Sequence, residues 1–74
     1  MNQEKTMDKD TFEHSIRKLL KTAGVGAQQE IEQAVAKALA AGTIAGSESF
    51  PATMTLRVAG LELEVVYDGE IKLA

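Results

Sequence analysis

The chain has 74 residues, including eight Lys and Arg, eleven Asp and Glu and no cysteine, and its formal net charge is -3. A single domain of this size hides only about 60% of the surface that its unfolded chain exposes, and neither a disulfide nor a cluster of His and Cys reinforces the thin core that results. The acidic balance opposes contact with phosphate backbones and with anionic lipid.

Order is predicted to begin at Asp10, after a polar tail over residues 1–9 that has no periodicity and that we expect to be disordered. Asp10, with Glu13 three positions later, approximates a capping box. Apolar residues then recur at helical spacing, and basic residues gather near the end of the segment, where they suit the helix dipole. This pattern predicts a first helix from about Thr11 to Ala23.

The tripeptide Gly24-Val25-Gly26 is predicted to end that helix, because its first glycine suits the left-handed cap position and its valine suits the hydrophobic contact that accompanies such caps. A second helix is predicted from about residue 27 to Gly42, with an apolar stripe rich in alanine. Small residues over 43–49 then form a connection, and Pro51 marks the entry to the first strand.

Apolar and polar residues alternate beyond Pro51, which predicts three antiparallel strands with the middle strand over residues 61–66. A two-residue turn at Ala59-Gly60 keeps the apolar residues of the first two strands on one face and sets Arg57 opposite Glu62. Alanine resists the positive φ that this turn requires, so a longer loop stays open as an alternative.

The second turn is predicted at Tyr67-Asp68-Gly69. A three-residue loop with glycine in the left-handed position sets Val65 opposite Ile71. The same register places Glu64 beside Lys72, whereas a two-residue turn would mix the two faces.

The predicted fold class is therefore α+β: an αα-hairpin of two N-terminal helices packed on one face of a three-stranded antiparallel meander, as a single domain over residues 10–74. One core is expected between the two layers, formed by Ile16, Leu19, Leu20, Ile31, Val35, Leu39, Met54, Leu56, Val58, Leu61, Leu63, Val65, Ile71 and Leu73.

Residues that carry chemistry are few. His14 is the only histidine, and although Asp10 lies one helical turn before it, nothing supplies a third metal ligand or a nucleophile. The glycines at 24 and 26 lack both the third glycine of a dinucleotide fingerprint and the lysine of a P-loop. Glu62 and Glu64 belong to a solvated salt-bridge face. We therefore predict a protein that is not an enzyme, with no catalytic residue, metal or cofactor.

Arg17, Lys18 and Lys21 form a candidate basic surface patch. With a second helix after the glycines and a hairpin as wing, they suggest one alternative function, a helix-turn-helix-like nucleic-acid-binding module. Against this alternative, Glu30 and Glu32 stand where a reader of the major groove presents Arg, Lys or Asn. The preferred hypothesis is a small non-catalytic protein-interaction or regulatory module.

Self-association is the second part of that hypothesis, because both outer strands of the predicted sheet are edges. Pro51 and Arg57 protect the first edge, but only Lys72 protects the second. We expect a weak homodimer through a candidate edge-strand interface at Ile71, Lys72 and Leu73, or an unidentified protein partner in place of a second copy. Nucleic acid and membranes are not expected as partners.

Residues typical of caps, turns and core positions follow one another in a recognisable order: Ser15-Ile16-Arg17-Lys18 with Lys21 and Gly24-Val25, Glu30-Ile31-Glu32 with Ala34-Val35, Pro51-Ala52, Gly60-Leu61 with Leu63, and Gly69-Glu70-Ile71. In this order the chain, over about residues 8–74, resembles a family of short bacterial proteins known only as a domain of unknown function. The resemblance implies a bacterial cytosolic protein and no activity or cofactor. A cytoplasmic location also agrees with the lack of any 18-residue apolar stretch.

Overall fold

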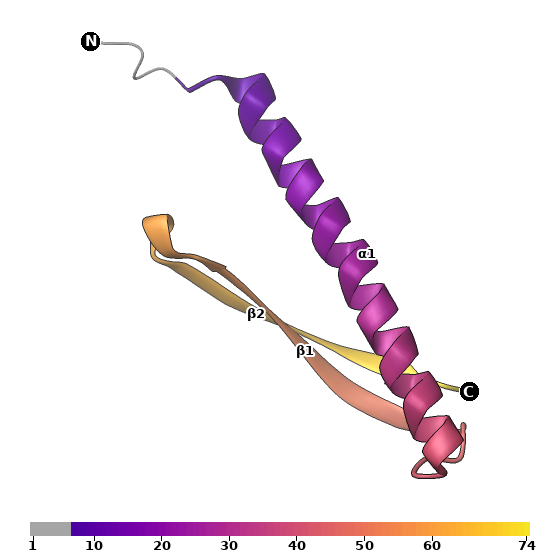
Figure 1. The fold of residues 1–74 in the computed structure, drawn as a ribbon. Helices are drawn as coiled ribbons and strands as arrows, with labels where there is room; N and C mark the ends of the chain where they lie inside the picture. Colours follow the sequence, from indigo (N-terminus) through magenta and orange to yellow (C-terminus); the bar gives the residue numbers. More distant parts are fainter. Residues whose placement is uncertain (1–6) are drawn as a thin grey trace. The chain divides into compact units, whose positions relative to one another are not determined.

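The computed structural model describes residues 7–74. It contains one long helix, α1 (Lys9–Ala41), and two strands, β1 (Ser49–Val58) and β2 (Leu63–Lys72), joined by a 3-10 turn, η2 (Ala59–Leu61), as Figure 1 shows. The strands form a two-stranded antiparallel sheet. The α+β class is retained, but the prediction of two helices followed by three strands is wrong.

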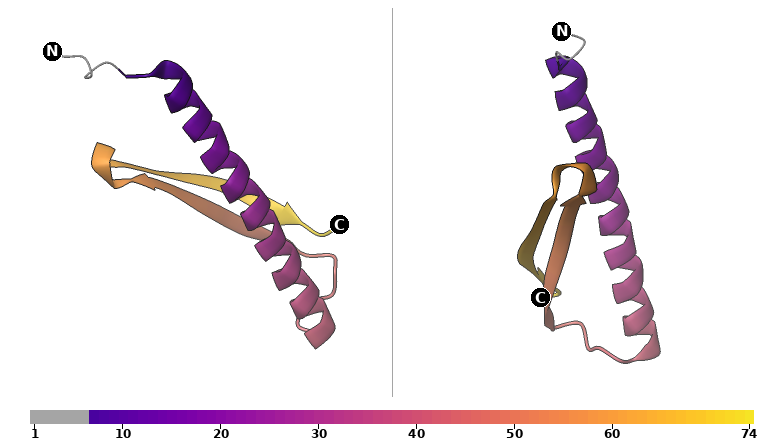
Figure 2. Two further views of the ribbon diagram at one scale, coloured as in Figure 1. Left: turned by 45° about the horizontal axis from the view of Figure 1, so that its top comes forward. Right: turned by 90° about the vertical axis from the view of Figure 1, so that its left-hand side faces the viewer.

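α1 continues through the two glycines that were predicted to break it, and Figure 2 shows the helix without an interruption in both views. Among the described residues, glycines with positive φ occur only at Gly42 and Gly46, so Gly24 and Gly26 keep helical backbone. Each glycine costs about 1 kcal/mol relative to alanine in a helix interior. Ending the helix instead would leave up to eight backbone groups unpaired and require a second nucleation, which is the larger cost.

The N-terminus of α1 is capped by Asp8 and not by Asp10. The Asp8 side chain accepts hydrogen bonds from the backbone N–H groups of Asp10, at 3.1 Å, and Thr11, at 3.2 Å. The Asp8 carbonyl accepts the first helical bond from Phe12, at 3.0 Å. The hydrogen bonds to the Asp8 side chain, chiefly those from Thr11, lower the pKa of Asp8. The helix therefore begins at Lys9, inside the tail predicted to be disordered, and residues 1–6 of that tail lie outside the described residues.

The C-terminus of α1 confirms the prediction that the helical segment ends at Gly42. Gly42 has φ 75, and its N–H donates to the carbonyl of Leu39 at 3.1 Å. The N–H of Thr43 donates to the carbonyl of Ala38 at 3.1 Å, and the Thr43 hydroxyl donates to the same carbonyl at 3.2 Å. This is the paired-bond pattern of a Schellman cap, which needs a left-handed residue and therefore favours glycine.

The β1–β2 turn is longer than the preferred two-residue turn, which confirms the alternative of a longer loop. Val58 pairs with Leu63, so four residues, 59–62, connect the strands. Glu62 alone in this turn has positive φ, at 52, and Ala59 avoids the strained backbone that a two-residue turn would impose on it. Because the register moves by two residues, the apolar residues stay on one face, but Arg57 faces Glu64 and not Glu62.

The predicted turn at Tyr67-Asp68-Gly69 does not form, and β2 runs straight through it. Tyr67 pairs with Met54 and Gly69 with Ala52. Val65 therefore does not face Ile71, and Glu64 does not face Lys72. β1 begins at Ser49, so its apolar alternation starts at Phe50 and supplies a partner for Ile71. Ten paired positions on a long hairpin replace the short third strand.

The predicted single core is also absent, because none of the residues that the structure describes is buried. The chain divides into a unit that ends at Lys37 and a unit from Ala38 to Ala74. α1 is the only element among the described residues of the first unit. The most shielded residues of the hairpin share one of its faces and are half-buried: Phe50, Ala52, Leu56, Val58, Val65 and Ile71.

Candidate functional site

The first candidate site is an apolar stripe on α1, here called the helix stripe. Successive members are four, four and three residues apart, a repeat of eleven that drifts only about 20° around a straight helix. The stripe is therefore nearly parallel to the helix axis along its whole length. Its members are Phe12, Ile16, Leu20, Ala23, Ala27, Ile31, Ala34 and Ala38.

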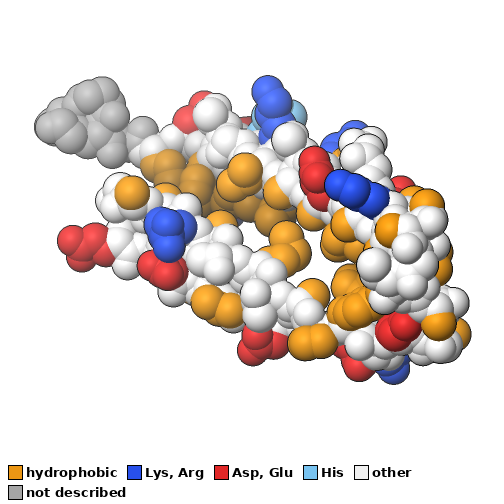
Figure 3. All heavy atoms as spheres, turned by 60° about the horizontal axis from the view of Figure 1, so that its bottom comes forward, with side chains coloured by type: hydrophobic (Ala, Val, Ile, Leu, Met, Phe, Trp, Pro, Cys, Tyr) orange, Lys and Arg blue, Asp and Glu red, His pale blue; other side chains and the backbone are white. Residues whose placement is uncertain are grey.

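Large side chains of the helix stripe are exposed to solvent. Phe12, Ile16 and Ile31 are 40 to 47% exposed, and Leu20 is 61% exposed. Leu19 flanks the stripe and is also exposed. Figure 3 shows hydrophobic side chains at the molecular surface. Up to Ala34 the stripe lies in the unit that ends at Lys37, in which α1 is the only element among the described residues, and Ala38 belongs to the second unit.

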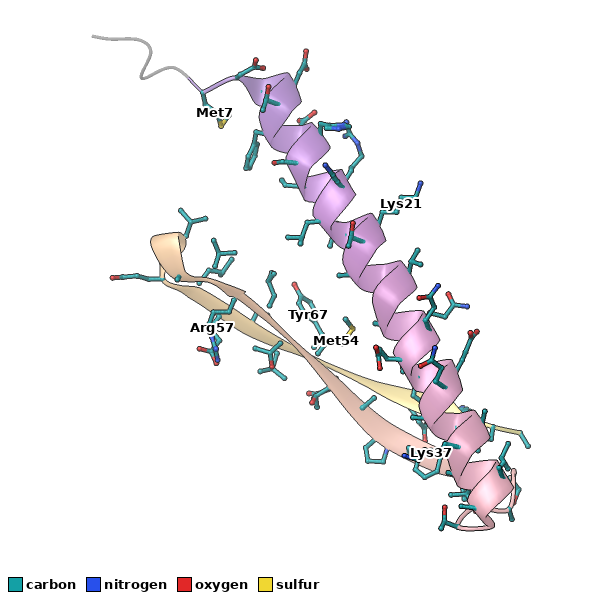
Figure 4. All side chains as sticks on the ribbon, viewed as in Figure 1. Met7, Lys21, Lys37, Met54, Arg57 and Tyr67 are labelled. Carbon is teal, nitrogen blue, oxygen red and sulfur yellow. The ribbon has the colours of Figure 1, made fainter. Side chains whose placement is uncertain are left out.

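The second candidate site is the apolar face of the β1–β2 hairpin. In Figure 4, Met54 and Tyr67 project from one face of the hairpin and Arg57 from the other, in agreement with the pairing of Met54 with Tyr67. Met54 and Tyr67 remain 55% and 59% exposed. The middle of this face is thus its least shielded part.

The opposite face of the hairpin is polar. Arg57 and Glu64 face each other across the strands, with 3.3 Å between the Arg57 Nη2 and a Glu64 carboxylate oxygen. Lys72 Nζ lies 3.8 Å from a carboxylate oxygen of Glu70 on the same strand. All four side chains are mostly exposed, so the ion pairs contribute at most about 1 kcal/mol each. This face has the solvated character predicted for it, with different partners.

The candidate edge-strand residues lie at the end of β2. Ile71 pairs with Phe50 and Lys72 with Ser49, and the N–H of Leu73 extends the ladder by donating to the carbonyl of Glu48 at 2.9 Å. Because the sheet has two strands, β2 has one edge paired with β1 and one edge without a neighbouring strand in the described hairpin. The same is true of β1.

The candidate basic patch lies on α1, and its three residues are exposed. Arg17 and Lys21 are one helical turn apart and share a side of the helix, with Lys18 next to them. The structure does not place them before a turn, since α1 continues beyond them. The helix-turn-helix arrangement that gave this patch its proposed role is therefore not formed in residues 7–74.

Sequence reasoning missed one residue that holds the backbone of the connection after α1. Glu48 uses both carboxylate oxygens to accept backbone N–H groups of the connection after α1, from Ala45 at 2.7 Å and from Gly46 at 2.9 Å. These two bonds, that from Ala45 first, lower the pKa of Glu48. Gly46 has φ 106, a backbone conformation that L residues rarely adopt. The sequence did contain a signal for this role, because Glu48 directly follows a run of small residues that includes Gly46.

The described residues contain no group of three or more His, Cys, Asp and Glu side chains placed to hold a metal ion. No helix within residues 7–74 has the length and apolar character needed to cross a membrane.

Comparison with known proteins gives one informative match. No curated protein and no solved structure matches the chain. The model of the Family of unknown function (DUF6494) matches residues 7–74, almost the whole chain. This match confirms the resemblance to a short domain of unknown function, and the chain belongs to DUF6494.

Proposed function

We propose that this protein is a small non-catalytic interaction module and that the helix stripe of α1 is its main contact surface. The observation that carries the proposal is the exposure of the large side chains of the stripe, Phe12, Ile16, Leu20 and Ile31, along α1. The proposal keeps the bacterial cytoplasmic setting that the family resemblance implied.

The energetics of α1 support a partner. Most of the stability of a helix in a protein comes from packing of its amphipathic face, because isolated helices are marginal in water. α1 also contains two internal glycines, which together cost about 2 kcal/mol relative to alanine. Fully burying one exposed Leu, Ile or Phe side chain contributes about 1.5 to 3 kcal/mol. Burying one or two large side chains of the stripe against a partner would therefore offset the cost of the two glycines in α1.

The alternative nucleic-acid function has no comparable support. Its helix-turn-helix is replaced by a continuous α1, and the net charge of -3 opposes a phosphate backbone. Arg17, Lys18 and Lys21 are adequately explained as part of the solvated side of an amphipathic helix.

A photo-cross-linking side chain tests the proposal in cells that naturally make the protein. It is placed at Leu20, in the helix stripe, and in a matched variant at Lys18, about 160° away around the helix. We expect a discrete protein adduct from position 20 and none from position 18. Equal adducts from both positions, or none from position 20, would contradict the proposal.

A further inference from the structure

The direction of the backbone groups in the β1–β2 hairpin follows from one hydrogen bond at its open end. The N–H of Leu73 donates to the carbonyl of Glu48 at 2.9 Å, one step beyond the pair Ser49 and Lys72. Hydrogen-bonded and non-hydrogen-bonded pairs alternate along an antiparallel ladder. The residues of the non-hydrogen-bonded pairs, here called the outward residues, therefore turn their backbone groups away from the partner strand. They are Ser49, Pro51, Thr53, Thr55 and Arg57 in β1, and Glu64, Val66, Asp68, Glu70 and Lys72 in β2.

The outward residues of β2 oppose pairing of this edge with a copy of itself. All but Val66 are charged, and most of the charges are acidic. When two β2 strands pair antiparallel over three or more outward residues, every register sets one acidic residue opposite another, for example Asp68 opposite Asp68 or Glu64 opposite Glu70. Like charges directly opposite on adjacent strands are destabilising. The β2 edge is therefore protected by its charges.

The outward residues of β1 are almost uncharged. Arg57 is the only charged residue among them, so no register that joins two or more outward residues sets like charges opposite each other. Pro51 has no N–H, but Thr53, Thr55 and Arg57 present outward N–H groups between Pro51 and the turn. Both threonines are exposed, and threonines at facing positions of adjacent strands pair favourably. β1 is therefore the edge that accepts a further strand.

α1 cannot provide this strand, wherever it lies. Apart from its two ends, the backbone N–H and C=O groups of a helix are used in its own hydrogen bonds. A helix that packs on a face of the hairpin would stabilise it but would leave the outward backbone groups of β1 unpaired. A two-stranded hairpin is marginally stable in water, whereas a sheet of three or more strands with an apolar face is stable. The outward groups of β1 therefore need an extended segment from outside the chain.

We propose that β1 of a second copy of this chain pairs antiparallel with β1, so that two hairpins form a four-stranded sheet in the order β2-β1-β1-β2. The difference in charge between the two edges selects this partner. Pairing through β1 leaves the two protected β2 edges on the outside, so the assembly stops at a dimer with two-fold symmetry. The apolar faces of both hairpins then lie on the same side of one sheet. This contact uses the hairpin and goes beyond the helix stripe of the proposed function.

The first test substitutes proline on each edge in the full chain. Thr55 and Val66 are opposite each other in one non-hydrogen-bonded pair, so neither Thr55→Pro nor Val66→Pro removes a ladder bond of the hairpin. Thr55→Pro should weaken the dimer at least roughly tenfold in sedimentation across a dilution series, because each copy loses an intermolecular hydrogen bond. Val66→Pro is the matched control, and it should leave the dissociation constant within about threefold of the original value.

The second test uses the unmodified chain, with amide hydrogen exchange followed by NMR at low and high protein concentration. The N–H groups of Thr53 and Thr55 should exchange more slowly at high concentration, because the dimer protects them. Those of Val66 and Asp68 should exchange equally fast at both concentrations. The N–H of Leu56 points to β2, so its protection shows that the hairpin is intact in each proline variant. If Thr55→Pro loses that protection, the exchange of the unmodified chain decides.

The other outcomes overturn the proposal. A chain that stays monomeric at every concentration, with rapid exchange at Thr53 and Thr55, refutes the second copy as partner. Concentration-dependent protection of Val66 and Asp68 instead would move the contact to β2. Protection on both edges with a mass that keeps growing would indicate an open ribbon of hairpins and not a closed dimer. None of these results bears on cross-linking at Leu20, so the helix stripe is tested separately.

Discussion

At the scale of single residues, two glycines of α1 have opposite roles. Gly42 holds the left-handed cap of the helix, with φ 75, whereas Gly24 has helical backbone. A Cβ added at either position meets no atom within 4 Å. A difference in stability between the alanine variants at these two sites therefore reflects the backbone conformation alone.

We predict that Gly42→Ala destabilises the protein by about 1 kcal/mol, because alanine resists the left-handed conformation. Gly24→Ala should stabilise it by up to about 1 kcal/mol, since alanine is the better helix former. Thermal unfolding followed by circular dichroism measures both changes. A loss of stability from Gly24→Ala would contradict the continuous helix, because a cap glycine at that position would be the simplest cause.

Glu48 connects the conformation of the segment after α1 to pH. Its pKa is lowered by hydrogen bonds from Ala45 and then Gly46. A lowered pKa means that the two bonds are fully present above the usual carboxyl range and are lost as the pH falls through the lowered value.

We therefore predict that the amide proton shifts of Ala45 and Gly46 move together in an NMR titration, with a midpoint below that of an unperturbed glutamate. Glu48→Gln should abolish this shared transition and leave the amides insensitive over the same range. A midpoint at or above the ordinary glutamate value would mean that the carboxylate does not hold the connection in this way.

At the scale of elements, the hairpin depends on a four-residue turn in which Glu62 has φ 52. Left-handed backbone costs a non-glycine residue roughly 1 kcal/mol. Glu62→Gly should therefore stabilise the hairpin by a few tenths of a kcal/mol up to about 1 kcal/mol in chemical unfolding. Glu64→Gly serves as the control, and it should destabilise, because Glu64 lies in β2 opposite Arg57.

The periodicity of the sequence was sufficient to assign faces but not to fix the lengths of elements. Alternation of apolar residues placed Leu56, Val58 and Val65 on one face, and the structure agrees. The turn signals were misread, because Gly24-Val25-Gly26 and Tyr67-Asp68-Gly69 tolerate helix and strand at a modest local cost. Each prediction treated glycine as a stop, whereas continuing the element keeps more backbone hydrogen bonds.

The candidate sites were predictable to a similar degree. The helix stripe was visible as apolar spacing, but it was divided between two shorter helices, whereas the structure carries it on one continuous α1. The role of Glu48 was not visible, because two backbone hydrogen bonds to one side chain depend on the folded path of residues 45–48.

At the scale of the whole molecule, the net charge argues against binding of nucleic acid. We predict no measurable binding of duplex DNA at physiological salt, because three clustered cations release few counterions and the chain carries a net charge of -3. Fluorescence anisotropy with a labelled duplex is the measurement. A complex that weakens steeply with salt and is lost on Arg17→Glu would reverse this conclusion.

The unbroken α1 constrains how the length of this protein can vary. One inserted residue in the middle of the helix would turn everything beyond it by about 100°, so the two halves of the stripe would face different directions. An insertion of eleven would restore the alignment, and the connection over residues 42–48 lies outside the stripe altogether. Members of DUF6494 that differ in length should therefore differ after the helix, or within it by whole repeats.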